Sequence, residues 1–231
     1  MDIETGFSEL TKKNLRNVER EIEQENVDWP IAVEGKEGSG KSAVAQALGI
    51  EIDGEKFDPE KQIAFSGEEF ERKAKKIGAD PSRKVVIYDE GVDDFMATDT
   101  MTSESRERVK FFRQCRELNL IPIVVMPVFV EMNKKIRNNR IKTLARCMKK
   151  GKPGNRTRYV LWYGEETLKE IEKDGDDVNY PSSNSSDQWS DPEKEWPEIW
   201  ETYIEMKKGN LNDDSENEED QISVPEIVRI V

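Results

Sequence analysis

The chain has 231 residues, of which 37% are charged and 35% hydrophobic, and its formal net charge is −13 at pH 7. It contains no apolar run of about 18 residues and no secretory signal pattern, so we expect a cytoplasmic protein. The sequence has no histidine, which excludes histidine-based catalysis, and its two isolated cysteines, Cys115 and Cys147, argue against a disulfide framework or a zinc site.

The N-terminal part of the sequence predicts a helix, a strand and a phosphate-binding loop. A thin apolar stripe over residues 8–26 predicts a charged helix that covers an edge of the core. Residues 31–34 are predicted to be the first strand. Residues 35–42 read Gly-Lys-Glu-Gly-Ser-Gly-Lys-Ser and fit the pattern G-x-x-x-x-G-K-[ST] at every defined position. A short helix over residues 43–48, closed by Gly49, is predicted to follow.

This loop predicts a binding site for ATP and Mg²⁺. Its glycines let backbone N–H groups approach phosphate oxygens, Lys41 would reach the β- and γ-phosphates, and Ser42 would hold the metal ion. The residues expected to bind the nucleotide are Gly35, Lys36, Glu37, Gly38, Ser39, Gly40, Lys41, Ser42 and Ala43.

The next predicted strand covers residues 62–65. Ser66 and Glu69 then form a capping-box pair that predicts the start of a helix, which runs to about Ile77. Gly78 is expected to end this helix because glycine is the usual residue just past a helix C-terminus.

Two carboxylates follow the third predicted strand, which covers residues 84–88 and is apolar from Val85 on. Ligands bind at the carboxyl ends of the strands in open α/β sheets, so Asp89 and Glu90 should face the phosphates. Asp89 is expected to hold Mg²⁺ together with Ser42. Glu90 is expected to orient or deprotonate the attacking water.

The rest of the predicted core continues the alternation of helices and strands. The predicted elements are a loop over 91–101, a helix over 103–118, a strand over 121–126, a basic helix over about 130–148, a turn over 151–154 and a fifth strand over 159–163. The alternation predicts an α/β fold, namely a P-loop NTPase with a mainly parallel five-stranded sheet between helices and a helical C-terminal appendage.

The composition changes after Asp174, where the sequence becomes rich in Asp, Ser, Asn and Gly. Residues 174–191 are predicted to be a linker or long loop. Trp196, Ile199, Trp200, Tyr203 and Met206 recur at helical spacing and predict a helix that docks on the core. Residues 212–220, with six acids in nine positions, are predicted to be disordered, and residues 221–231 to be a strand or a docking peptide. The predicted division is 1–28 N-terminal helical extension, 29–173 ATPase core, 174–211 linker and aromatic helix, and 212–231 acidic tail and terminal apolar peptide.

One segment is strongly basic although the chain as a whole is acidic. From Asn133 to Arg158 there are eleven Lys and Arg residues and no Asp or Glu: Lys134, Lys135, Arg137, Arg140, Lys142, Arg146, Lys149, Lys150, Lys152, Arg156 and Arg158. A positive field of this kind attracts polyanions, so residues 134–158 are expected to contact the phosphates of DNA or of a neighbouring subunit's ATP.

The chain resembles the additional-strand, catalytic-glutamate branch of P-loop ATPases, and within it the DNA-packaging and zonula-occludens-toxin-like ATPases of viruses and mobile elements. The resemblance covers about residues 28–165, and its motifs are residues 35–42, Asp89-Glu90, 113–119, 121–126 and 136–140. It implies a DNA-packaging or DNA-translocating motor that works as a homo-oligomeric ring. The chain departs from the pattern at Met126-Pro127, where such enzymes often carry a polar sensor of the γ-phosphate.

A ring-forming ATPase would need an arginine supplied by the adjacent subunit. The candidates are Arg137, Arg140 and Arg146, with Arg140 as the first choice. Two other readings of the loop remain open. A small-molecule or nucleotide kinase could use residues 134–158 as an arginine-bearing lid. A signalling GTPase is disfavoured, because Asn133-Lys134-Lys135-Ile136 lacks the aspartate of the guanine-reading motif.

Overall fold

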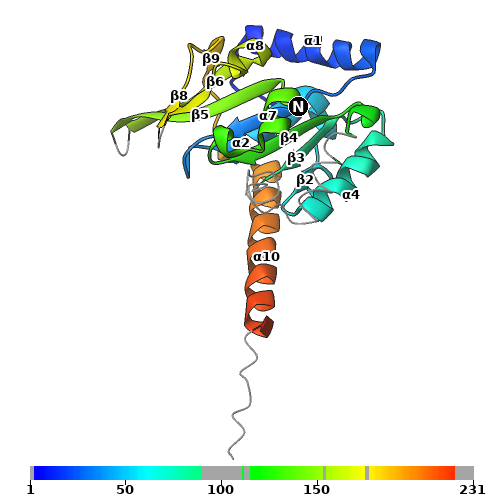
Figure 1. Ribbon diagram of the computed structural model, residues 1–231. Helices are drawn as coiled ribbons and strands as arrows, with labels where there is room; N and C mark the ends of the chain where they lie inside the picture. The colour runs from blue at the N-terminus through cyan, green and yellow to red at the C-terminus, as the bar shows by residue number, and fades with distance from the viewer. Residues whose placement is uncertain (1–2, 90–110, 112–114, 153–154, 175–176, 222–231) are drawn as a thin grey trace, which may run out of the picture.

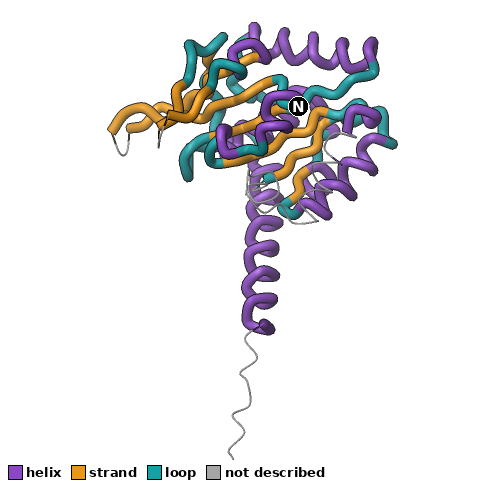
Figure 2. Tube along the Cα trace, viewed as in Figure 1, coloured by secondary structure: helices purple, strands orange, loops and turns teal. Residues whose placement is uncertain are grey.

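The computed structural model describes residues 3–89, 111, 115–152, 155–174 and 177–221, and only the backbone at residues 152, 155, 156 and 211–221. These residues form one central sheet with helices on both of its faces (Figures 1 and 2). The α/β fold predicted from the sequence is therefore confirmed.

The main sheet has seven strands among the described residues, in the order β2-β3-β4-β1-β5-β6-β9. Their bounds are β1 (Ile31–Glu34), β2 (Ile63–Ala64), β3 (Val85–Tyr88), β4 (Ile121–Met126), β5 (Thr143–Lys152), β6 (Asn155–Gly164) and β9 (Ser185–Asp187). Strands β2 to β5 in this order pair in parallel, whereas β6 and β9 are antiparallel to their neighbours. The predicted sheet of five strands was thus two strands too small.

Strand β4 lies between β1, which leads into the phosphate loop, and β3, which ends at Asp89. All three strands run in the same direction, so their carboxyl ends lie at one edge of the sheet. This order brings two sequence motifs together that are more than forty residues apart in the chain.

Each face of the sheet has its own hydrophobic core, because side chains alternate between the two faces along a strand. Ile31 and Val33 of β1 face one core, which is covered by α1 (Glu9–Glu25), α2 (Lys41–Asp53) and the first turns of α10 (Pro197–Gln221). Ala32 faces the other core, which is covered by α4 (Gly67–Gly78) and α7 (Lys134–Asn139). The buried sheet is thus a rigid support for the loops at its edge.

Two predicted helices form, and the second has the predicted cap. Helix α1 begins after Ser8, whose hydroxyl accepts a hydrogen bond from the Thr11 N–H at 3.3 Å. Helix α4 begins after Ser66, whose hydroxyl accepts from the Glu69 N–H at 3.3 Å, while the Glu69 carboxylate accepts from the Phe65 N–H at 3.1 Å. Each cap provides a partner for backbone donors that the first turn of a helix leaves free.

Helix α2 is longer than the sequence predicted, because Gly49 does not end it. The helix continues to Asp53. A Cβ at position 49 would lie 2.2 Å from the ring of Phe57, so this glycine is needed for close packing rather than for a turn. The chain then passes through short helices at Gly54–Lys56 and α3 (Pro59–Gln62) into β2.

The prediction of a basic helix over residues 130–148 was wrong for its second half. A short 3-10 helix at Phe129–Glu131 and α7 precede β5, which forms a hairpin with β6. Pairing of Ile31–Glu34 with Thr143–Arg146 draws this segment into the sheet, and tertiary pairing overrides its helical propensity. The hairpin extends past the end of β1 and projects from the body (Figure 1).

The predicted linker over residues 174–191 also contains structure. Strands β7 (Glu172–Asp174) and β8 (Asp177–Asn179) form a small ladder, and β9 adds to the edge of the main sheet. Asp187 is buried there and accepts hydrogen bonds from the Ser8 N–H at 3.0 Å and the Trp162 indole N–H at 2.7 Å. Short helices α8 (Glu165–Leu168) and α9 (Pro192–Glu195) flank these strands.

The prediction that the aromatic stripe docks on the core is confirmed. Trp196 and Tyr203 belong to the hydrophobic core, and Ile199, Trp200 and Met206 pack against it. Helix α10 continues through residues 212–220, which were predicted to be disordered, and its far half leaves the body (Figure 1). Residues 222–231, predicted to be a strand or docking peptide, lie outside the described residues, as do the predicted loop over 91–101 and most of the helix over 103–118. Within the described segments, we find no helix whose length and hydropathy would suit it to cross a bilayer.

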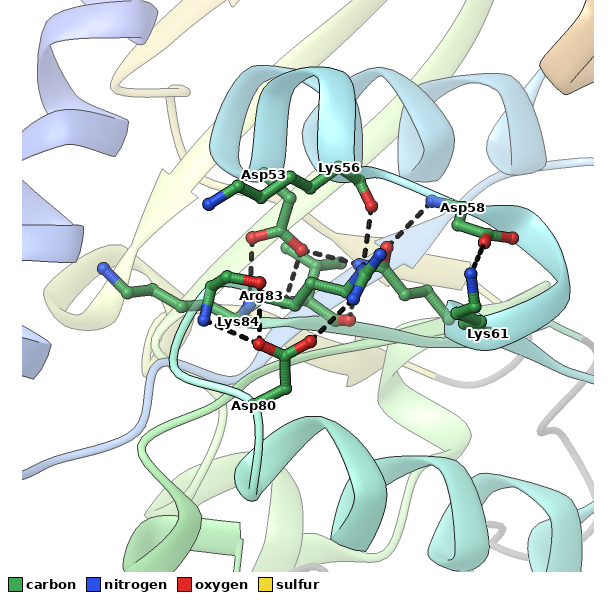
Figure 3. A network of polar contacts seen from close by, with 10 residues as sticks. Asp53, Lys56, Asp58, Lys61, Asp80, Arg83 and Lys84 are labelled. Atoms are coloured by element: carbon green, nitrogen blue, oxygen red, sulfur yellow. Dashed lines mark hydrogen bonds and ion pairs between the residues drawn. The ribbon is translucent and has the colours of Figure 1, made fainter.

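A polar network centred on Asp53 joins the end of α2 to the start of β3 (Figure 3). The Asp53 carboxylate accepts from the backbone N–H groups of Lys84 at 2.9 Å and Val85 at 3.1 Å and from the Gln62 side-chain amide at 2.6 Å. Burial raises the pKa of Asp53, against the lowering effect of these hydrogen bonds. Toward solvent, the network ends in the exposed ion pair of Lys61 with Asp58.

We expect the Asp53→Ala variant to lose about 2–4 kcal/mol of unfolding free energy, because it leaves buried donors without an acceptor. Lys61→Ala is the matched control in the same network, and its exposed ion pair should contribute no more than about 1 kcal/mol. Urea unfolding followed by circular dichroism measures both. Equal losses in the two variants would contradict this account of the network.

Candidate nucleotide and metal site

The phosphate loop connects β1 to α2 at the carboxyl edge of the sheet, as predicted. Gly38 and Gly40 have φ angles of +62° and +96°, which residues with a side chain rarely adopt. Gly40 is also the N-cap of α2, and no side chain caps this helix end. The first N–H groups of α2 therefore remain available to an anion, and the helix dipole favours negative charge there.

Lys41 lies against the loop that it is predicted to serve. Its ammonium group donates to the backbone oxygen of Gly35 at 3.0 Å and lies 3.5 Å from that of Lys36. The lysine therefore bridges the two ends of the loop. Bound phosphate oxygens would offer this ammonium group charged acceptors in place of neutral carbonyls.

Ser42 and Asp89 meet although they come from different elements. The Ser42 hydroxyl donates to the Asp89 carboxylate, with oxygen–oxygen distances of 2.9 and 3.3 Å. Asp89 is 2% exposed, and its N–H donates to the Ala64 carbonyl at 2.9 Å, which fixes the end of β3. A hydroxyl and a carboxylate are hard oxygen ligands of the kind that Mg²⁺ takes beside waters and substrate phosphates. The pair fits the predicted metal site.

A pocket of about 830 Å³ lies in front of the loop. It is lined by Gly38, Lys41 and Ser42 of the loop and the start of α2, and by Asp89 and Met126 at the ends of β3 and β4. Met126 is buried, so the apolar residue that the sequence showed at the position of a γ-phosphate sensor is part of the pocket wall.

The C-terminal helix also lines this pocket, which the sequence did not predict. Trp200, Tyr203, Ile204 and Lys207 of α10 line it. The Tyr203 hydroxyl donates to the Asp89 carboxylate at 2.6 Å, and Tyr203 itself is 3% exposed. The aromatic stripe was the available signal, but helical spacing alone could not tell which part of the core the helix would cover.

Trp189, which follows β9, covers the loop from the side. Its ring lies so close to Gly40 that a Cβ there would stand 2.2 Å from two ring carbons. Position 40 thus requires glycine both for its backbone conformation and for this contact.

A buried carboxylate precedes the loop. Glu34 ends β1, is 1% exposed, and accepts from the Phe129 N–H at 2.7 Å. Burial raises its pKa, while the hydrogen bonds and the Arg146 guanidinium, 3.3 Å away, act in the opposite direction. Arg146, one of the three arginines considered for a neighbour's site, is thus paired inside its own chain and stacks on the Tyr180 ring at 3.4 Å.

The other two arginines are also held within the chain. Arg137 donates to the Val130 carbonyl at 2.8 Å, and burial lowers its pKa. Arg140 pairs with Asp28, a carboxylate just before β1, at the edge of the sheet opposite the chain's own phosphate loop. Their role in a neighbouring subunit stays a prediction. Glu90 lies outside the described residues.

Comparison with known proteins adds three solved structures of low similarity. No protein-family profile matches the sequence, and no curated protein matches it. The N-terminal domain of zonular occludens toxin from Neisseria meningitidis is 13% identical, with a TM-score of 0.42 over 69% of this chain and 96% of that one. The flagellar accessory protein FlaH from Methanocaldococcus jannaschii is 14% identical, with a TM-score of 0.37 over 59% and 77%. A KaiC-like protein from Pyrococcus horikoshii is 14% identical, with a TM-score of 0.33 over 75% and 77%.

The fold is that of a P-loop NTPase. This assignment depends on three features of the chain itself: the strand order, the loop between β1 and α2, and the Ser42–Asp89 contact.

We expect Gly40→Ala to weaken ATP binding by about tenfold or more, because the added methyl group strains the loop and meets Trp189. Gly54→Ala is a matched control, since Gly54 has a φ of +59° but open space around its Cβ position. This control should cost about 1–3 kcal/mol of stability and leave the affinity unchanged. Calorimetric titration with Mg-ATP measures both variants, and equal affinities would contradict the proposed contact.

Proposed function

We propose that this protein is an ATP hydrolase that uses Mg²⁺. The observation that supports this best is the hydrogen bond of Ser42 to Asp89, beside an uncapped helix N-terminus and the Lys41 ammonium group. Ser42 and Asp89 would hold the metal ion, which would neutralise phosphate charge, and Lys41 with the loop N–H groups would bind the phosphates.

Hydrolysis also needs a group that activates water. Glu90 follows Asp89 directly in the sequence and is the proposed base. The acidic pair favours transfer to water, because it supplies both a metal ligand and a base at one strand end.

Two substitutions separate binding from turnover. Lys41→Ala should lower ATP affinity by about 100-fold, since it removes a charge-assisted contact with phosphate. Glu90→Gln should keep the affinity within about threefold and lower turnover by about 10²–10⁴-fold. Calorimetry and phosphate release measure the two quantities. Normal turnover by Glu90→Gln would remove this carboxylate from the mechanism, and unchanged binding by Lys41→Ala would contradict the site itself.

We further propose that the hydrolase acts on DNA as a homo-oligomer, in the manner of the packaging and translocating motors of viruses and mobile elements. The β5–β6 hairpin supports this proposal because it projects from the body and carries the end of the basic segment. Lys150 is exposed on this hairpin, so its ammonium group is accessible to a phosphate of DNA.

Replacing Lys150 and Lys152 by Glu should lower the salt dependence of DNA binding by about two units of slope, one for each lost phosphate contact. Lys169→Glu with Lys173→Glu makes the same change of charge on exposed positions outside the hairpin. Affinity for duplex DNA across a series of salt concentrations measures both pairs. Identical slopes for the two pairs would contradict a specific role of the hairpin, and a rate per chain that does not depend on protein concentration would contradict the oligomer.

A further inference from the structure

Two cations of the hairpin are directed at the phosphate loop of the same chain. Lys149 in β5 and Arg158 in β6 are paired across the two strands. Side chains two residues apart in a strand share a face, so Lys149 lies on the face of Cys147 and Arg158 on the face of Val160. Both of those residues are buried in the core beneath α2. The rung formed by Lys149 and Arg158 therefore lies on the face of the hairpin that is turned toward the loop, where Lys149 is half-buried and Arg158 is exposed.

The contacts of the two side chains agree with this direction. The Lys149 ammonium nitrogen lies 3.2 Å from the point where a Cβ of Gly38 would stand. Arg158 lines the pocket, and its guanidinium carbon lies 5.4 Å from the centre of the Trp189 ring, which in turn rests on Gly40. The two cations thus flank the loop, one near Gly38 and one above Trp189.

Neither cation has a carboxylate partner among the described residues, whereas Arg140 pairs with Asp28 and Arg146 with Glu34. Like charges directly opposite each other on two strands destabilise the pairing. The loop beneath them adds the positive end of α2 and the Lys41 ammonium group. The pocket is also lined by Glu37, Asp191 and Glu193, but none of these carboxylates forms an ion pair with Lys149 or Arg158. A polyanion bound in the loop would give both cations a partner.

We propose that Lys149 and Arg158 bind the triphosphate of the nucleotide in cis, which deepens the proposed function and rests on it. The hairpin supplies two positive charges to the phosphates from within the chain, so these charges do not depend on an arginine from a neighbouring subunit. Cations placed where phosphoryl charge develops accelerate transfer as well as binding.

The test measures Mg-ATP, Mg-ADP and inorganic tripolyphosphate binding by calorimetry in the absence of DNA, together with phosphate release by dilute protein. Lys149→Ala and Arg158→Ala should each weaken ATP and tripolyphosphate binding by about tenfold, ADP binding less, and the double variant more than either. Lys149→Arg should retain most of the affinity, because it keeps the charge. Lys173→Ala removes the same charge from an exposed strand outside the hairpin and should bind as the wild type does.

Three outcomes would overturn the inference. Wild-type affinity in both alanine variants would remove the two cations from the nucleotide site while leaving the hydrolase proposal intact. An equal loss in Lys173→Ala would show an effect of net charge alone. A wild-type protein that binds neither ATP nor tripolyphosphate would contradict the proposed function and this inference together. Urea unfolding of each variant distinguishes a lost contact from a lost fold.

Discussion

The carboxylate of Asp89 joins three elements of the fold at one point. It receives the Ser42 hydroxyl from α2 and the Tyr203 hydroxyl from α10, and it lies at the end of β3. A buried carboxylate with two hydroxyl donors is a strong local constraint, because removal of either donor leaves charge poorly compensated. The position of the C-terminal helix and the geometry of the metal site are therefore parts of the same arrangement.

Each edge of the sheet carries an ion pair whose carboxylate is buried. At the amino edge, Asp28 holds Arg140, and at the carboxyl edge Glu34 lies next to Arg146. Burial raises the pKa of both carboxyl groups, which reflects the cost of keeping charge away from water. Both pairs link β1 or its approach to the segment around β5, so the strand before the loop is fixed at each end.

The phosphate loop and the strand ending at Asp89 could be predicted because each depends on a local pattern. Gly35 to Ser42 follows an apolar strand, and the apolar run 85–88 needs no distant partner to be recognised. Residues 143–152 could not be predicted in the same way, because their strand exists through pairing with β1 and β6. The same holds for Tyr203 and Trp189, whose contacts with Asp89 and Gly40 join segments more than one hundred residues apart.

The contact between Trp189 and Gly40 restricts how this site can vary. A relative with a smaller residue at position 189 would keep a usable loop, because position 40 would still be glycine. A residue other than glycine at position 40 is excluded while Trp189 is present, because its side chain would meet the indole ring. Position 40 also needs glycine for its φ of +96°, so in an alignment of related chains position 189 should vary while position 40 stays glycine.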